Sequence, residues 1–197
     1  MLEPLTQVHT LSDADVAAAT LRDSRAFAEV VVRYEEKLTR YIRRLGVRNV
    51  EDGEDVLQEI FIKVYKNLNA YDSSLAFSSW IYRIAHNEAI SFYRKQAVRP
   101  EGHQLTDSTD VLTWLPDDGM APADRLFDVT VNAQVVQGAL ATLDPKYRDA
   151  LILRYFEHKE YDEISDILKI PIGSVGTLIH RGKQQLGQHI SPQHVAI

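Results

Sequence analysis

The sequence predicts an all-α protein built from two small helical domains. Residues that favour helices are plentiful, whereas alternating runs typical of β-strands are few. Apolar residues recur at three- and four-residue steps in several stretches, which is the spacing of one buried helix face. The 197 residues are enough for one or two small domains, and a composition of 45% hydrophobic and 25% charged residues is typical of globular proteins.

The composition excludes several classes of protein. The chain has no cysteine, which removes disulfides, thiolate metal sites and cysteine nucleophiles and fits a reducing cytosol. The N-terminus lacks the basic segment and apolar run of a signal peptide, and no stretch approaches the roughly 20 apolar residues of a membrane span. We therefore expect a cytoplasmic protein.

The N-terminal half contains several helix signals. Ser12 and Asp15 have the spacing of a capping box, which marks a helix start. Gly46 can end a preceding amphipathic helix as its C-terminal cap. A polar loop is expected over residues 68–77. Long helices are expected over residues 25–45, 50–68 and 78–96.

A linker is expected over residues 98–128. It contains three of the seven prolines, and its seven acidic residues outnumber two basic ones. Few apolar residues recur with a helical period there, so we expect at most a short helical turn near residues 111–115. The resulting division of the chain is a tail over 1–24, a domain over 25–97, the linker, a domain over 129–190 and a tail over 191–197.

Helical patterns resume after the linker. A helix is expected over residues 129–143. Asp144 can cap the next helix, and Pro145 in its first turn loses no hydrogen bond because that amide has no helical partner.

Residues 161–186 are expected to form two short helices joined by a tight turn. Pro171 ends the first helix, because the residue before a proline avoids helical geometry. The second helix is expected from Gly173 or Ser174. The expected buried face of the first helix consists of Tyr161, Ile164, Ser165 and Leu168, and that of the second consists of Val175, Leu178, Ile179, Gly182 and Leu186.

The residues on the opposite face of the second helix are small, polar or cationic. A helix needs such residues on one face to enter the DNA major groove. The spacing alone fits an ordinary helical hairpin with a solvated face equally well. The string EIxxxLxIPxGSVxTxIHRGxxxL, from Glu163 to Leu186, closely resembles the helix-turn-helix of bacterial extracytoplasmic-function (ECF) sigma factors, which reads the minus-thirty-five promoter element. The DNA contacts that this resemblance implies are Ser174, Thr177, His180, Arg181 and Lys183. Gly176 and Leu178 stand where many members carry cations.

A second resemblance covers residues 77–95, which are similar to the sigma segment that melts and reads the minus-ten element. In that family the preceding loop receives a flipped base. An aromatic ring, an amide and cations on one helix face also suit single-stranded DNA, because bases stack on rings and cations hold phosphates. Burial of Trp80 in the core is the simpler alternative for that residue. The implied minus-ten residues are Asn69, Tyr71, Trp80, Arg83, Asn87, Ser91, Arg94 and Lys95.

The acidic residues of the 50–68 helix allow three interpretations. Asp52, Asp55 and Glu59 could bind a divalent metal, but no second carboxylate set or Glu-x-x-His completes such a site. They could also merely stabilise the helix N-terminus through its dipole. Thirdly, residues 55–59 resemble the sigma segment that docks on the β′ clamp helices of RNA polymerase. The implied polymerase-binding residues are Asp55, Gln58, Glu59 and Lys63.

No catalytic motif is present: the chain lacks Gly-x-Ser-x-Gly, a phosphate-binding glycine loop and His-Glu-x-x-His. We expect no enzyme activity, no catalytic residues, no metal and no cofactor. The resemblance implies a sigma factor that binds core RNA polymerase (β′ clamp helices and β flap) and promoter DNA and is controlled by an anti-sigma factor. Two alternatives stay open, namely a stand-alone helix-turn-helix regulator and a sigma-like adaptor or decoy that binds an anti-sigma factor.

The net charge of −6 favours a DNA-binding protein that works within a larger complex. Neutralisation of phosphates by cations supplies most non-specific DNA affinity. A weakly charged or acidic chain would therefore bind DNA poorly by itself.

Overall fold

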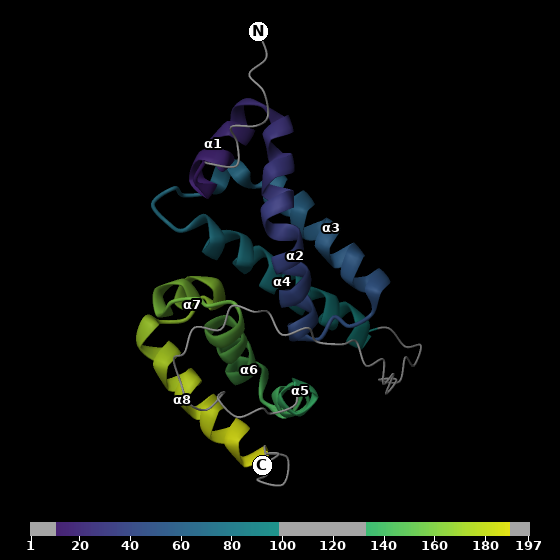
Figure 1. Ribbon diagram of the computed structural model, residues 1–197, viewed down its shortest axis with the longest axis vertical. Coiled ribbons are helices and arrows are strands. Elements are labelled where there is room, and N and C mark those ends of the chain that lie inside the picture. Colours follow the sequence, from purple (N-terminus) through teal and green to yellow (C-terminus); the bar gives the residue numbers. More distant parts are fainter. Residues whose placement is uncertain (1–10, 99–132, 190–197) are drawn as a thin grey trace.

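The computed structural model describes residues 11–98 and 133–189, and all regular secondary structure in these ranges is helical. The predicted all-α class is therefore confirmed. Figure 1 shows two groups of helices, with α1–α4 in one and α5–α8 in the other. Most of the expected linker, including the turn near residues 111–115, lies outside the described residues.

The first group is a bundle around α2 and α4. Its elements are α1 (Asp13–Arg22), the 3₁₀ turn η2 (Ser24–Ala26), α2 (Phe27–Leu45), α3 (Val50–Lys66), the 3₁₀ turn η3 (Leu68–Ala70) and α4 (Phe77–Val98). Ser12 caps α1 by accepting the Asp15 amide at 3.2 Å, as the sequence predicts. Gly46 ends α2 in the left-handed region at φ 119°, a conformation that side chains disfavour.

The core of this group follows the predicted apolar stripes. Three helices contribute residues that are completely or almost completely buried, and their contacts fix the orientation of α4. Because these positions face inward, the polar residues between them face outward or toward the second group. The central buried residues are Leu38, Tyr41 and Ile42 from α2, Ile60 and Val64 from α3, and Ile81, Ala85 and Ala89 from α4.

The second group consists of α5 (Ala133–Thr142), α6 (Pro145–Leu151), a π-helical turn η4 (Ile152–Phe156), α7 (Tyr161–Leu168) and α8 (Ile172–His189). Asp144 caps α6 by accepting the Lys146 amide at 3.1 Å. Lys169, at φ 55°, ends α7. The expected stripe of Val175, Ile179, Gly182 and Leu186 is buried, and Leu178 is half-buried.

One expected core residue is on the surface. Tyr161 is 41% exposed, whereas Ile167 is 1% exposed and takes its place in the core with Ile164. The buried face of α7 is therefore rotated from the predicted one. The Tyr161 ring instead packs against the Arg154 guanidinium, 5.4 Å from its centroid.

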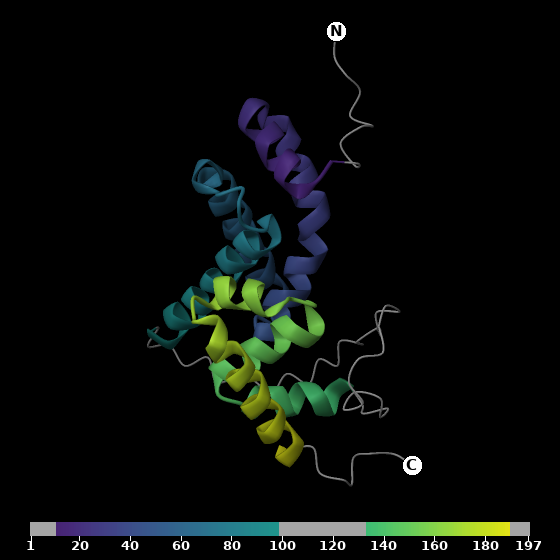
Figure 2. The same ribbon diagram turned by 90° about the vertical axis from the view of Figure 1, so that its left-hand side faces the viewer.

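The two groups are packed against each other. Helix α7 lies along α4, and the two views agree on this arrangement (Figures 1 and 2). The sequence does not predict this contact. None of the described helices is long and apolar enough to cross a membrane.

Candidate nucleic-acid interface

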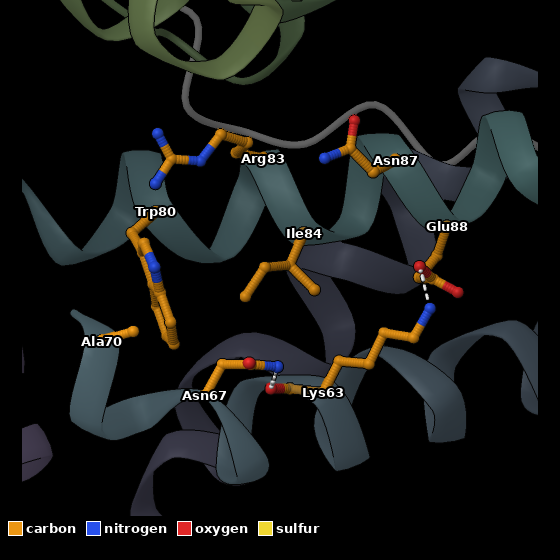
Figure 3. A pocket seen from close by; sticks show the side chains of 8 residues that line it. All are labelled: Lys63, Asn67, Ala70, Trp80, Arg83, Ile84, Asn87 and Glu88. Atoms are coloured by element: carbon orange, nitrogen blue, oxygen red, sulfur yellow. Dashed lines mark hydrogen bonds and ion pairs between the residues drawn. The ribbon is translucent and has the colours of Figure 1, made fainter.

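A pocket of about 380 Å³ lies between α3, η3 and α4 (Figure 3). Its floor combines an indole edge and an aliphatic side chain with amide and cationic groups at the rim. A flipped base needs such a combination, because a pocket must replace lost stacking and present hydrogen-bonding groups. The lining residues are Lys63, Asn67, Ala70, Trp80, Arg83, Ile84, Asn87 and Glu88.

Two local interactions shape the rim of this pocket. The Lys63 ammonium forms an ion pair with the Glu88 carboxylate, which ties α3 to α4 across the pocket (Figure 3). The Asn67 amide donates to the Lys63 carbonyl at 2.8 Å. Lys63 is in the set implied for polymerase docking, but the structure places it beside the minus-ten candidates.

Trp80 is 6% exposed and belongs mainly to the core. Its ring centroid lies 5.5 Å from that of Tyr71 and 5.6 Å from that of Phe77. The Tyr71 hydroxyl donates to the Leu75 carbonyl at 2.7 Å, which holds the loop before α4 against this cluster. Trp80 therefore borders the pocket as a buried member of a packed aromatic cluster.

The remaining minus-ten candidates lie at different places. Arg83 and Asn87 line the pocket with Trp80. Asn69 is exposed in η3, while Ser91 is half-buried further along α4. Arg94 and Lys95 are exposed near the C-terminal end of α4. The structure thus brings three of the eight candidates together in one pocket.

The polymerase-docking candidates form a compact surface on α3. Asp55, Gln58 and Glu59 are all exposed and occupy neighbouring turns of one helix face. Gln58 also borders an apolar pocket of about 430 Å³ that includes the exposed Ile62 and Tyr65. Among the described residues, no group of three or more His, Asp or Glu side chains could hold a metal ion.

The recognition-helix candidates lie on the outer face of α8. Thr177, His180 and Arg181 are exposed, whereas Ser174 and Lys183 are half-buried. The Lys183 ammonium lies 5.7 Å from the centroid of the Tyr155 ring. Three side chains of this set are therefore free of the core and available to a DNA groove.

The contact between α4 and α7 is made by side chains outside the buried face predicted for the first helix of the hairpin. The Glu163 carboxylate accepts from the hydroxyls of Ser78 (3.0 Å) and Ser79 (3.2 Å). Arg83 donates to the Asp166 carboxylate at 2.9 Å. Neither carboxylate belongs to the predicted buried face, and the spacing of apolar residues gave no signal of the partner.

Further interactions extend this contact along α4. Glu157 accepts from Tyr82 at 2.8 Å and from Arg44 at 2.6 Å. His86 lies 3.9 Å from the Asp149 carboxylate. In the described part of the chain, the residues of α2 and α4 that face carboxylates of the second group thus include Arg44, Ser78, Ser79, Tyr82, Arg83 and His86.

The electrostatics of this contact favour an ionised Glu163. Burial alone would raise the pKa of its carboxyl group. Hydrogen bonds from the Glu160 amide, Lys159 and Ser78 outweigh burial, and the pKa lies below its ordinary value. Glu163 is therefore a charged acceptor in the contact.

Comparison with known proteins agrees with this geometry. Residues 30–99 match the family profile "Sigma-70 region 2", and residues 133–186 match "Sigma-70, region 4". The ECF RNA polymerase sigma factor SigW of Bacillus subtilis (strain 168) is 33% identical over 173 residues, which cover 85% of this chain and 90% of that protein. The chain belongs to the ECF sigma factors.

This sigma factor also shares its fold with solved structures. CnrH in complex with the cytosolic domain of CnrY has a TM-score of 0.65 and 22% identity, covering 89% of this chain and 95% of that one. The sigma factor RpoE of Bartonella quintana, in complex with the anti-sigma factor NepR, has a TM-score of 0.60 and 20% identity, with coverages of 83% and 96%. The family profiles and the 33% identical relative confirm the predicted family and its function in transcription initiation, and the solved structures confirm the fold.

Proposed function

We propose that this sigma factor divides promoter recognition between α8 and the pocket bordered by α4, while α3 docks on core polymerase. The observation that carries the proposal is that all three surfaces consist of side chains held by a packed helical core, on segments matching sigma regions 2 and 4. Rigid helices position such groups better than loops do.

Polymerase docking is assigned to the exposed carboxylate and amide groups of α3. Asp55, Gln58 and Glu59 present acceptors on one face, which suits basic residues of a partner. The neighbouring Ile62 and Tyr65 add apolar area at the same surface.

The minus-ten element is assigned to the pocket lined by Trp80, Arg83 and Asn87. Tyr71 packs on Trp80, and Asn69 lies in η3 next to Ala70, which lines the pocket. Arg94 and Lys95 would hold phosphates further along the strand. The minus-thirty-five element is assigned to Thr177, His180 and Arg181 on α8, with Ser174 and Lys183 beside them. These groups bind and separate strands; bond formation stays with the polymerase, so the chain works without catalytic residues, metal or cofactor.

The domain boundaries implied by these assignments are 25–97 and 129–190. The chain would work in the bacterial cytoplasm, where polymerase and promoter DNA are found. Control by an anti-sigma factor is proposed from the fold, which is shared with a sigma factor solved with such a partner. Inhibition of reconstituted transcription by a purified candidate anti-sigma domain would test this part.

The main test is transcription in vitro with sigma-free bacterial core polymerase and a pool of genomic promoter fragments. Sequence-specific transcripts are expected, and their start sites would reveal both promoter elements. The variant Asp55→Ala/Gln58→Ala should lose transcripts because it cannot dock. The matched control is Glu54→Ala, which changes an exposed carboxylate on the same helix. Core binding without transcripts would instead support the decoy, and duplex binding without core binding would support a stand-alone regulator.

A further inference from the structure

Helix α1 precedes the residues that match the region 2 profile, which begins at residue 30, yet it contacts the elements that form the minus-ten pocket. Val16 and Ala17 on its inner face are buried, and the helix packs on α2, η3 and α4. In the described part of the chain, η3 and α4 supply residues to the pocket, whereas α1 supplies none. The functions assigned above therefore leave α1 without a role.

The first turn of α1 is joined to α2 through the Asp13 carboxylate. Its Oδ1 atom accepts from the Arg33 guanidinium at 2.8 Å, and its Oδ2 atom accepts from the Tyr34 hydroxyl at 2.5 Å. Arg33 also donates to the Glu29 carboxylate and to the Leu11 carbonyl. An acidic residue in the first turn stabilises a helix through the helix dipole, but that effect needs no partner. Both oxygens of Asp13 instead hold neighbouring residues of α2.

Tyr34 extends this connection into the aromatic cluster of Tyr71, Phe77 and Trp80. It is 3% exposed, and its ring centroid lies 5.8 Å from that of Phe77. The Phe77 centroid in turn lies 5.1 Å from that of Tyr71 and 5.6 Å from that of Trp80. The rings of Tyr34 and Tyr71 both meet Phe77 edge to face, an arrangement that aromatic pairs prefer. Because buried side chains are closely packed, the position of each ring restricts that of the next.

We propose that Asp13 is a positioning residue for minus-ten recognition. It fixes the Tyr34 hydroxyl, and Tyr34 then determines through Phe77 where the Trp80 ring borders the pocket. The proposal rests on the proposed function of that pocket, which Trp80 lines and Asp13 does not. Removal of the Asp13 carboxylate leaves the Tyr34 hydroxyl without this acceptor, so the ring shifts away from Phe77 to satisfy its hydroxyl elsewhere.

The electrostatics agree with a close coupling between α1 and the aromatic cluster. Burial raises the pKa of Tyr34 above its ordinary value, and the hydrogen bond to Asp13 and the charge of Asp13 add to this effect. Burial also raises the pKa of Tyr71, with the Asp13 charge as the next cause. Asp13 therefore acts on both tyrosines that flank Phe77, and both stay neutral hydrogen-bond donors.

Asp15 offers a matched control in the same helical turn. It is exposed, and its carboxylate accepts from the Ser12 hydroxyl at 2.6 Å. Asp13→Ala and Asp15→Ala each remove one acidic residue from the first turn, so the net charge and the interaction with the helix dipole change alike. Tyr34→Phe removes only the hydroxyl and keeps the ring beside Phe77, so the core keeps its shape.

The test uses the holoenzyme formed from the full chain and core polymerase. The probe is a labelled single-stranded oligonucleotide with the non-template minus-ten sequence of a promoter identified by transcription. Oligonucleotides with an abasic nucleotide at each position in turn identify the captured base, as the position where its removal most weakens wild-type binding. Fluorescence anisotropy gives the Kd of the intact and of this abasic strand. Their ratio measures base capture, because a loss of folded protein affects both strands equally.

Asp13→Ala and Tyr34→Phe are each expected to weaken binding of the intact strand about tenfold and that of the abasic strand little, since misplacing a group by about 1 Å can cost up to about 100-fold. The double variant Asp13→Ala/Tyr34→Phe should lose no more than either single variant, because both changes break the same interaction. Asp15→Ala should keep the wild-type ratio.

An unchanged ratio in Asp13→Ala, or an equal fall in Asp15→Ala, would overturn the proposal. Equal weakening of the intact and abasic strands would indicate a purely structural role and would also overturn it, as would additive losses in the double variant. Failure of the proposed function has a different signature, namely a wild-type holoenzyme that makes no transcripts or that binds intact and abasic strands equally, and this result would overturn both.

Discussion

Arg44 on α2 and Glu157 after η4 are far apart in the sequence, but their side chains form a 2.6 Å ion pair between the two groups of helices. The Arg44 side chain is 12% exposed and that of Glu157 is 5% exposed. Tyr82 donates to the second oxygen of the same carboxylate at 2.8 Å. This shielded carboxylate links three helical elements, so its removal should lower the stability of the whole fold.

Replacing Glu157 with Leu is expected to lower the free energy of unfolding by about 3 kcal/mol, because it leaves the Arg44 charge shielded from water without this carboxylate. Urea unfolding followed by circular dichroism would measure the loss. Arg44→Met/Glu157→Leu should recover most of it, since no charge is then left behind. Glu36→Gln is the control, because Glu36 pairs with Arg40 and is 85% exposed. A loss no larger than that of the control would contradict the prediction.

Acid is expected to weaken the packing of α4 on α6 through His86. The ring lies 3.2 Å from the Tyr41 hydroxyl and 3.9 Å from the Asp149 carboxylate. Burial lowers the pKa of His86 below its ordinary value, with Asp149 opposing this effect and Arg148 adding to it. The unfolded chain therefore binds a proton at higher pH than the folded one. Stability is fully present above about pH 6.5 and declines as the pH falls through the lowered pKa, by about 1.4 kcal/mol per unit of difference.

The measurement is the urea midpoint between pH 7.5 and 5.5, with His86→Gln as the comparison. The urea midpoint of His86→Gln should depend less on pH over this range than that of the wild type. Burial raises the pKa of Asp149 above its ordinary value, so its own contribution has the opposite slope, with stability lost as the pH rises through a lower window. Equal slopes in the wild type and His86→Gln would refute the assignment to His86.

Gly176→Arg is expected to strengthen DNA binding by α8. The position is helical, and a Cβ there would meet only the Tyr161 ring at 3.6 Å, an ordinary contact. The new cation would add about one phosphate contact and raise the steepness of the salt dependence by about one unit. Titration of duplex promoter DNA at several salt concentrations would measure both. Gly176→Gln supplies a long neutral side chain as the control, and an equal gain there would argue against a charge effect.

Arg181→Ala is expected to cost about 1–3 kcal/mol at the minus-thirty-five element if the exposed guanidinium makes a bidentate guanine contact. Gln184→Ala, another exposed change on α8, should cost little. Binding titrations with promoter fragments identified by transcription would compare the two. An unchanged promoter affinity for Arg181→Ala would contradict the assignment of a base contact to Arg181.

Gly182→Ala should destabilise the helix-turn-helix by about 1–3 kcal/mol through overpacking. A Cβ at this position would lie 3.0 Å from Leu151 Cδ1, 3.1 Å from Leu151 Cγ and 3.3 Å from Tyr147 Cβ. Gly187→Ala is the control, because a Cβ there meets nothing within 4 Å and alanine favours helix. The melting temperature should fall for Gly182→Ala and rise for Gly187→Ala relative to the wild type. Equal melting temperatures of the two variants would contradict the close packing of α6 on α8.

The local structure was predictable because it depends on near neighbours in sequence. Ser12, Gly46 and Asp144 start or end helices where their chemistry predicts, and the stripe through Val175 and Ile179 is buried. Tyr161 was misplaced because a large amphipathic ring satisfies a helical period while still finding a better partner on the surface. Periodicity indicates that a helix has a buried face, but it does not fix the angle of that face around the helix axis, so Ile167 and not Tyr161 enters the core.

The contacts between the groups were not predictable in the same way. Glu163 and Asp166 have the spacing of an ordinary solvated face, and nothing local distinguishes a carboxylate that meets water from one that meets Arg83. Lys63 illustrates the same limit, because its helix face fits polymerase docking while its ammonium reaches Glu88 across the pocket. Such pairings depend on how distant segments dock, which residue spacing does not encode.

The position of Trp80 gives the molecule a natural optical probe. Only two tryptophans occur in the chain, and the other, Trp114, lies outside the described residues. Replacement of Trp114 by Phe would leave a single indole that borders the minus-ten pocket and touches Tyr71 and Phe77. A base entering this pocket would stack near the indole and quench its emission. Strand capture could therefore be followed in real time as a change of emission intensity, without attaching any dye.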